Sequence, residues 1–180
     1  MPSASASPQP PGLTQLSDIY GSACNRIPTQ GPGSVLAMRN EPVGTAISNI
    51  PMLSTLTKAV RTAGLFDMLN QPNAAFTLLA PSDIAFQKLA HTELDTLLRD
   101  QTRLTQVLKY HLIPLRYNAR GLTDTPAVNT VEGSNLYIAG RTGDLRFGRR
   151  EHASVQCANI PTTNATVFII DQVLRPPDQR

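Results

Sequence analysis

The sequence lacks tryptophan, and aromatic residues make up only 5% of its 180 positions. It contains no uninterrupted apolar run of about 20 residues, the length that an α-helix needs to cross a bilayer, so we expect no transmembrane segment. Charged residues amount to 16% and the net charge is +3, far below the dense lysine and arginine content of nucleic-acid-binding proteins. The mild positive charge favours weak contact with anionic surfaces but does not identify a partner.

Common patterns of catalytic and metal sites are also absent. Ser82 does not lie in a Gly-x-Ser-x-Gly elbow, and the chain has no Cys-x-x-Cys, His-x-His or His-Glu-x-x-His spacing. The histidines His91, His111 and His152 are scattered, and capping of the next helix accounts for both Ser82 and Asp83. We therefore predict no catalytic residue, no metal site and no cofactor. A hydrolase that uses Ser82, His111 and an acid is the rival hypothesis.

The length and the 41% hydrophobic content predict one domain with a real core, and the sequence has no internal repeat. The start, MPSASASPQPPG, has no charged region followed by an apolar one, so it does not read as an intact signal peptide. Its serine, alanine and proline content predicts a flexible, solvated tether over residues 1–16. The expected domain covers 17–177, and residues 178–180 form a tail.

Only two cysteines occur, Cys24 and Cys157, near opposite ends of the expected domain. In a cytosolic protein such a pair would more often be unlinked thiols, whereas in an exported protein it is usually a disulfide. A bond between them would close a loop of over a hundred residues, which the chain-entropy model values at roughly 4.7 kcal/mol or slightly more. We favour a structural clasp and an oxidising compartment.

Apolar residues recur at helical spacing in the first two thirds of the chain, as in the stripe of Leu53, Leu56, Val60, Ala63 and Phe66. We interpret this stripe as core; if part of it were exposed, it would offer a groove for lipid or a partner helix. The spacing predicts helices over 43–50, 53–70, 84–89 and 104–112, and a brief helical turn over 92–98.

The last third alternates apolar and polar residues, which predicts strands. Leu136 and Ile138 form one arm of a hairpin, Leu145 and Phe147 form the other, and residues 140–144 supply the turn. Further strands are expected over 76–80, 155–160 and 167–173. Helices first and strands later, with one early strand, indicate an α+β class.

Tyr110 and His111 lie together at the end of an apolar helical run, in the stretch KYHLIP. Imidazole titrates near neutral pH and phenol is a versatile hydrogen-bonding group, so the pair is a candidate for chemistry or binding. The simpler interpretation is a buried polar pin that holds a helix end, because buried polar atoms need hydrogen-bond partners. We favour the pin.

A second candidate is the basic run RTGDLRFGRREH, residues 141–152. Arginines on a hairpin are in general merely solvated. Here few acids lie nearby, Arg146 points away from the apolar face, and two of the arginines are adjacent. A cationic surface for sulfated glycan, anionic lipid or acidic protein is the alternative. It would consist of Arg116, Arg120, Arg141, Arg146, Arg149 and Arg150.

Three separated stretches are similar, in order and spacing, to signature blocks of the fasciclin domain. They are FTLLAPSDIAFQKL (76–89), VLKYHLIPLRY (107–117) and NATVFIIDQVLRPP (164–177). The resemblance implies a compact α+β wedge of about seven strands in two sheets, with helices packed along one side. It also implies adhesion or extracellular recognition rather than catalysis, and in animal relatives the Tyr-His block has been tied to receptor recognition.

Further stretches, SACN and VQCANIPTTNATVFIIDQVL, resemble the secreted single-domain fasciclin antigens of mycobacteria and related actinobacteria. This resemblance implies a Cys24–Cys157 disulfide and a secreted or cell-surface location, with a lipid-anchored precursor as a further expectation. Because the resemblance implies a bacterial protein, we do not interpret the sequon Asn164-Ala-Thr166 as a glycosylation site. We expect a monomer whose partner is an extracellular or envelope protein, glycan or anionic lipid. A lipid or small-ligand carrier, which needs an enclosed apolar cavity, is the alternative.

Overall fold

The computed structural model describes residues 18–177 apart from 29 and 142. The expected tether over 1–16 and the tail over 178–180 therefore lie outside the described residues. The helices are η2 (Cys24–Arg26), α1 (Val35–Met38), α2 (Val43–Ser48), η3 (Pro51–Leu53), α3 (Ser54–Thr62), α4 (Phe66–Leu69), α5 (Asp83–Gln87), α6 (His91–Arg99), α7 (Gln101–Tyr110) and α8 (Ala119–Thr123), with η denoting 3₁₀ turns. The strands are β2 (Phe76–Pro81), β3 (Leu112–Ile113), β4 (Ala127–Asn129), β5 (Asn135–Arg141), β6 (Asp144–Phe147), β7 (Ala153–Pro161) and β8 (Ala165–Ile170).

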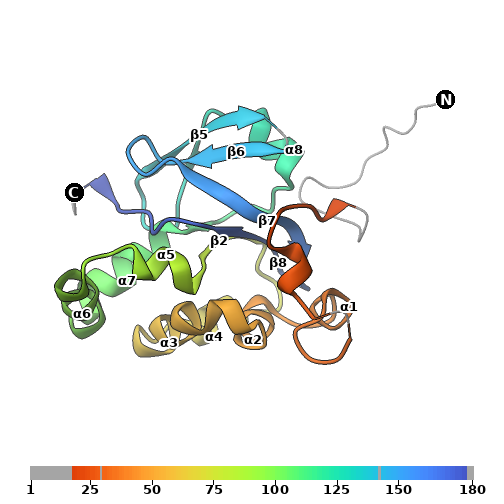
Figure 1. Cartoon of the computed structure of the whole chain (residues 1–180), viewed down its shortest axis with the longest axis horizontal. Coiled ribbons are helices and arrows are strands. Elements are labelled where there is room, and N and C mark those ends of the chain that lie inside the picture. The colour runs from red at the N-terminus through yellow and green to blue at the C-terminus, as the bar shows by residue number, and fades with distance from the viewer. Residues whose placement is uncertain (1–17, 29, 142, 178–180) are drawn as a thin grey trace.

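In the described part of the chain, seven strands are joined in the order β3-β2-β8-β7-β6-β5-β4, in which β2 and β8 run parallel and the other neighbours run antiparallel. Strand β7 carries two register shifts against β8, between residues 155 and 157 and between 157 and 160. Such bulges bend a strand and increase its twist. The sheet accordingly folds over itself, so that β5 and β6 form a layer above β2 and β8 (Figure 1). The two expected sheets are thus two layers of one continuous ladder.

Both faces of the β2–β8 pair are buried, which explains why these strands are apolar throughout. On one face, Leu78 and Val167 join the core beneath the helices. On the other face, Leu79 and Phe168 join a second core under the β5–β6 layer. The strand predicted over 76–80 is confirmed, and its partner β8 ends at Ile170 rather than at the predicted Val173.

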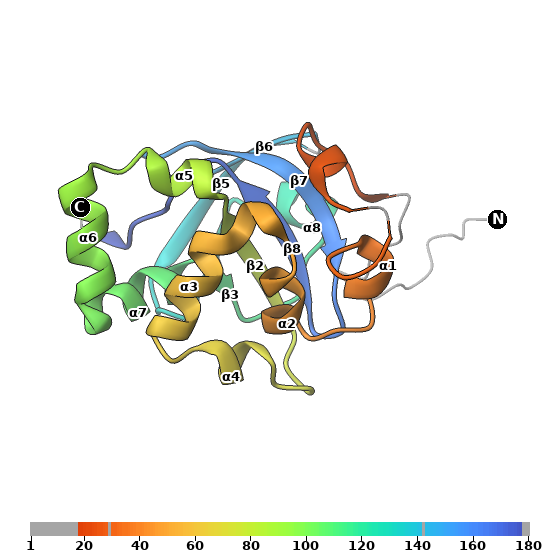
Figure 2. The same ribbon diagram turned by 60° about the horizontal axis from the view of Figure 1, so that its bottom comes forward.

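Helices α2, α3 and α4 cover the outer face of β2 and β8, as the tilted view shows (Figure 2). The single helix predicted over 53–70 is wrong, because the segment divides into η3, α3 and α4. Gly64 interrupts it with φ +74°, a left-handed conformation that glycine adopts at low cost. The apolar stripe is nevertheless core, since Leu53, Leu56 and Val60 are buried.

Several short elements differ from the prediction. The predicted turn over 92–98 is a full helix, α6, and helix 104–112 ends at Tyr110. The hairpin is confirmed as β5 and β6, with Ile138 opposite Phe147. Strand β4 and helix α8 were not predicted, because three and five residues are too few for a clear period.

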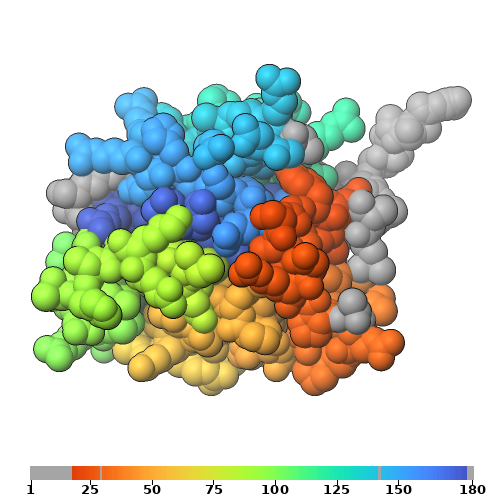
Figure 3. Space-filling model, viewed as in Figure 1, coloured from red at the N-terminus to blue at the C-terminus, as the bar shows by residue number. Residues whose placement is uncertain are grey.

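The N-terminal segment, residues 18–27, lies against β7 where β6 no longer pairs with it. Tyr20 forms a bridge with Ala158, and the Ala23 amide donates to the Gln156 carbonyl over 2.9 Å. A disulfide joins Cys24 and Cys157, whose Cα atoms are 5.0 Å apart. In the space-filling view this red segment lies across the face between the blue strands and the orange helices (Figure 3).

Candidate functional site

Tyr110 and His111 end helix α7, and both are 1% exposed. The Tyr110 hydroxyl donates to the Asn135 carbonyl over 3.0 Å, which connects α7 to the start of β5. His111 Nδ1 lies 2.7 Å from the Val107 carbonyl, and its Nε2 accepts from the Leu174 amide at 2.9 Å. The two side chains thus connect the helix end to the sheet and to the C-terminal segment.

The hydrogen bonds of His111 require the neutral ring with its proton on Nδ1, because a carbonyl accepts and an amide donates. Burial lowers the pKa of His111 to about 4, and the hydrogen bond to Val107 only partly offsets this effect. Both ring nitrogens are engaged with the main chain. Ser82 is likewise structural, since its hydroxyl accepts from the Ala85 amide at the start of α5. A serine–histidine pair of a hydrolase is not assembled from these two residues.

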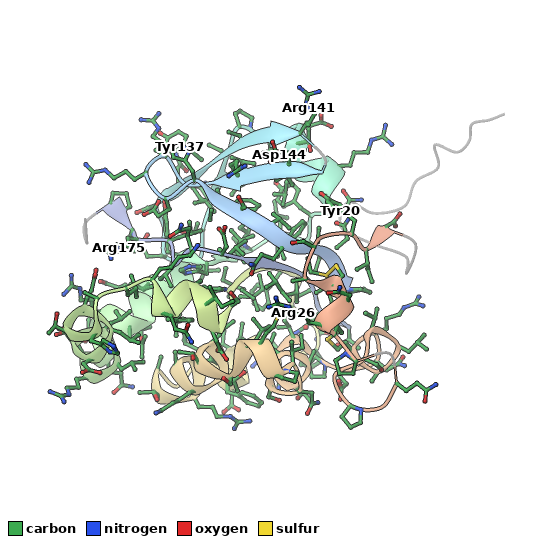
Figure 4. The ribbon with its side chains drawn as sticks, in the orientation of Figure 1. Tyr20, Arg26, Tyr137, Arg141, Asp144 and Arg175 are labelled. Carbon is green, nitrogen blue, oxygen red and sulfur yellow. A yellow bond between two sulfur atoms is a disulfide. The ribbon has the colours of Figure 1, made fainter. Side chains whose placement is uncertain are left out.

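The hairpin arginines lie on the outer face of β5 and β6. Arg146 is exposed between the buried Leu145 and Phe147, and its Nε pairs with Asp144 Oδ1 at 3.2 Å. Arg141 lies opposite Asp144 in the register of the two strands. Figure 4 shows Arg141 at the end of the hairpin, pointing away from the body of the molecule.

Arg149 and Arg150 are exposed in the turn after β6. The guanidinium of Arg149 lies over the Tyr137 ring, 3.7 Å from its centroid, as a cation–π contact. Tyr137 is 39% exposed and faces outward from β5. Sequence reasoning did not assign Tyr137 to the site, although its place between the buried Leu136 and Ile138 already indicated the outer face.

The structure does not bring Arg116 to the hairpin. Its guanidinium binds the turn between β7 and β8, with Nη2 donating to the Thr162 carbonyl over 2.8 Å. Arg120 is exposed on α8, which packs against β5. The six arginines predicted as one cationic surface therefore occupy at least two places, and Arg116 has a different environment from the others.

Asn164 of the sequon is 1% exposed and holds three segments together. Its Oδ1 accepts from the Val43 amide at 2.9 Å, while its Nδ2 donates to the carbonyls of Leu69 and Gln71 over 2.7 and 3.0 Å. The side-chain nitrogen that a glycan would occupy is thus used inside the fold.

An apolar cleft lies between α3, α4, α7 and β2, and His111 lines it together with Leu56, Leu65 and Leu108. Its volume is about 10 Å³, which is close to the space of a single water molecule. Within residues 18–177, leaving aside 29 and 142, no three histidine, cysteine or acidic side chains are grouped as for a metal ion. In the same residues no helix has the length and apolarity needed to cross a bilayer.

The described chain is thus an α+β domain with a folded-over seven-stranded sheet, a helical layer and arginines displayed on its outer hairpin. The family model of the fasciclin domain, which describes its sequence pattern, matches residues 51–176. The chain belongs to the fasciclin domain family, as its three sequence blocks predicted.

Similar proteins agree with this assignment. The chain is 36% identical to cell surface glycolipoprotein MPB83 of Mycobacterium bovis, over 99% of this chain and 84% of that protein. It is 35% identical to immunogenic protein MPT70 of Mycobacterium tuberculosis, over 89% and 83% of the two chains. The predicted likeness to mycobacterial fasciclin antigens is confirmed, and the name of the first relative supports the expected secreted or cell-surface location.

The fold is also found in a solved structure. A FAS1 domain pair from the insect cell adhesion molecule fasciclin I superposes with a TM-score of 0.66 at 20% identity. The match covers 78% of this chain and 52% of that longer one. The α+β fasciclin fold is confirmed by this likeness, which at such low identity carries no statement about partners.

Proposed function

We propose that this protein is a non-catalytic recognition module, secreted or held at the cell surface, that binds an anionic partner through the outer face of its β5–β6 hairpin. The observation that carries the proposal is the exposed row of Arg141, Arg146, Arg149 and Arg150. Between positions 141 and 150 only one acid, Asp144, occurs beside these four arginines. A lipid-anchored precursor accords with the name of the relative from Mycobacterium bovis.

The geometry of the row supports binding rather than simple solvation. Arg149 is held against Tyr137, and Arg146 is held against Asp144, so both lose less side-chain freedom on binding than mobile surface arginines would. Buried Leu145 and Phe147 fix the strand beneath them. A sulfated glycan, an anionic lipid headgroup and an acidic protein all present the negative charge that such a face attracts.

The two rival functions have less support. A hydrolase would need a base near its nucleophile, but the ring nitrogens of His111 are bound to Val107 and Leu174. A carrier would need an enclosed apolar cavity of several hundred Å³ for a drug-sized or lipid ligand. The cleft beside His111 has about 10 Å³.

The proposal is tested with immobilised protein and three probes: sulfated dextran, anionic phospholipid vesicles and a polyglutamate chain. The test variant is the triple change Arg146→Ala, Arg149→Ala and Arg150→Ala. The matched control replaces Arg26, Arg39 and Arg99 by alanine, because these arginines are also exposed and the net charge changes equally. Circular dichroism verifies that both variants are folded.

We expect at least one probe to bind the wild type and the control, and to bind the test variant roughly tenfold or more weakly. Exposed charge contacts contribute about 0.2–1 kcal/mol each, and about 1.4 kcal/mol corresponds to tenfold. Binding should also weaken when salt is raised from about 0.15 M to about 1 M, which shortens the Debye length from about 8 to about 3 Å. Equal weakening in both triple variants would mean that net charge, and not the hairpin, governs binding.

A further inference from the structure

Arg116 is a half-buried cation whose nearest partners are uncharged. Its Nε donates to Thr166 Oγ1 over 3.1 Å, Nη2 to the Thr162 carbonyl over 2.8 Å, and Nη1 to the Thr163 carbonyl over 3.4 Å. All three acceptors belong to the β7–β8 turn or its flanks. A guanidinium carries five N–H groups, so these contacts leave one on Nη1 and one on Nη2.

Among the residues that the structure describes, no carboxylate forms an ion pair with Arg116. Partial burial lowers the pKa of its guanidinium, while the Nη1 contact with Thr163 lies at the exposed surface. The ion pairs in the described part of the chain join other residues, at Lys88, Arg146 and Arg175. Cations that lose solvent are usually paired with an anion, because the cost of dehydration is otherwise not recovered. The site therefore favours a negatively charged ligand.

The backbone on both sides of Arg116 is fixed by a single buried residue. Thr77 on β2 is fully buried, and its hydroxyl donates to the Leu115 carbonyl and accepts from the Tyr117 amide, each over 2.7 Å. A guanidinium that is already immobilised gives up little conformational entropy when it binds a ligand. This arrangement distinguishes Arg116 from a mobile surface arginine.

Leu115, directly before Arg116, is 59% exposed, although its side chain is large and apolar. A single exposed leucine is normal on a protein surface. Here, however, it is displayed on a fixed loop beside an unbalanced cation. Such a pair fits an anion next to an alkyl group, which is the chemistry of a peptide, whereas sulfated glycans and membranes favour several clustered cations.

We propose that Leu115 and Arg116 form a recognition site for an acidic segment of a partner protein. An aspartate or glutamate carboxylate accepts from the Nη groups of Arg116, and an adjacent apolar side chain packs on Leu115. This site is separate from the hairpin, because Arg116 contacts the β7–β8 turn. It does not rest on the proposed function of the hairpin.

The test uses an array of short peptides with a central Asp or Glu flanked by Leu, Ile, Val or Phe, beside matched peptides with Asn or Gln. The test variant is Leu115→Asp, which places a carboxylate next to Arg116 and leaves the contacts of Arg116 with the turn in place. The control is Leu36→Asp on α1, because Leu36 is 58% exposed and so nearly matches Leu115. Arg116→Lys is the second variant; it keeps the charge but loses the planar fork.

We expect acidic peptides to be retained at least about tenfold more strongly than their amide counterparts by the wild type and the Leu36→Asp control. The Leu115→Asp and Arg116→Lys variants should each lose this preference. Leu115→Asp should do so with an unchanged melting temperature. The triple hairpin variant should keep it. Equal retention of acidic and amide peptides, or a preference that survives Leu115→Asp, would overturn the site. A preference lost only in the hairpin variant would also overturn it while supporting the proposed function.

Discussion

At the residue scale, the polar side chains that look most reactive are the most deeply engaged in the fold. His111 and Asn164 are each 1% exposed, and both make hydrogen bonds to the main chain. His111 bonds Val107 within its own helix and the distant Leu174, and Asn164 bonds the distant Val43 and Leu69. Buried polar groups of this kind stabilise one arrangement of segments, because any other arrangement leaves them without partners. The interpretation of KYHLIP as a pin of a helix end agrees with this geometry.

The pin predicts a specific dependence of stability on pH. Because the folded-state pKa of His111, about 4, is below its ordinary value of 6.5, the unfolded chain binds the proton more readily. The stability that the neutral, buried His111 contributes is fully present above about pH 6.5 and is lost as the pH falls towards about 4. The loss should approach about 3 kcal/mol. Urea denaturation at about pH 7 and about pH 4 measures it as the difference between the wild type and His111→Gln.

The control for this experiment is His91→Gln, because His91 is exposed at the start of α6. It should retain the pH dependence of the wild type, including the part contributed by carboxylates. If His111→Gln kept the whole dependence as well, the buried, neutral state of His111 would be wrong.

At the element scale, side chains from one helix complete the ends of another. Ser82 caps its own helix, α5, as predicted. Asp83, the other predicted cap, instead reaches α3, where its carboxylate accepts from the Ser54 hydroxyl over 2.6 Å and from the Thr55 amide over 2.8 Å. No residue of α3 supplies a side-chain cap of its own. The start of α3 thus depends on a residue 29 positions further along the chain.

Replacing Asp83 by alanine should therefore destabilise the protein by about 1–2 kcal/mol, the range for loss of a helix cap with a charged acceptor. Thermal denaturation checks this value. Hydrogen exchange should also show faster exchange at the first turn of α3 than in the wild type. Asp67→Ala is the matched control, since Asp67 is an exposed acid in the first turn of α4, and it should change stability little. Equal effects of the two changes would refute the capping role.

At the scale of the whole molecule, the disulfide attaches the N-terminal segment to the centre of the sheet. Cys157 is fully buried in β7, and the bond spans a sequence separation of 133 residues. Around it, the Ala158 amide donates to the Tyr20 carbonyl over 2.7 Å, and the Gly143 amide donates to the Tyr20 hydroxyl over 2.9 Å. Figure 4 shows Tyr20 on the side of this segment that faces the hairpin.

The double change Cys24→Ala and Cys157→Ala should reduce stability by about 3–5 kcal/mol, because a loop of this length strongly restricts the unfolded chain. Alanine is chosen because serine would place a hydroxyl in the core. Differential scanning calorimetry measures the loss, and hydrogen exchange at Ala23 and Ala158 shows whether the segment detaches locally. An unchanged melting temperature would mean that the hydrogen bonds alone hold the segment.

The sequence by itself determined the features that depend on neighbouring residues and on period. Alternation in 136–147 gave the hairpin, the apolar run before Ser82 gave β2, and three spaced blocks gave the family. Two cysteines without the spacing of a metal site favoured a structural disulfide, and the structure contains one between Cys24 and Cys157.

Only the tertiary structure decided which of these residues meet. Asp83 caps a distant helix, Arg116 contacts the β7–β8 turn instead of the hairpin, and Tyr137 supports Arg149. These contacts join residues that lie on different helices, strands and turns, each pair at least a dozen positions apart. Local propensity carries no information on such distances, since side-chain partners across a sheet are set by register and bending. Whether an arginine is solvated, stacked or left with an unbalanced charge is thus decided by the folded chain.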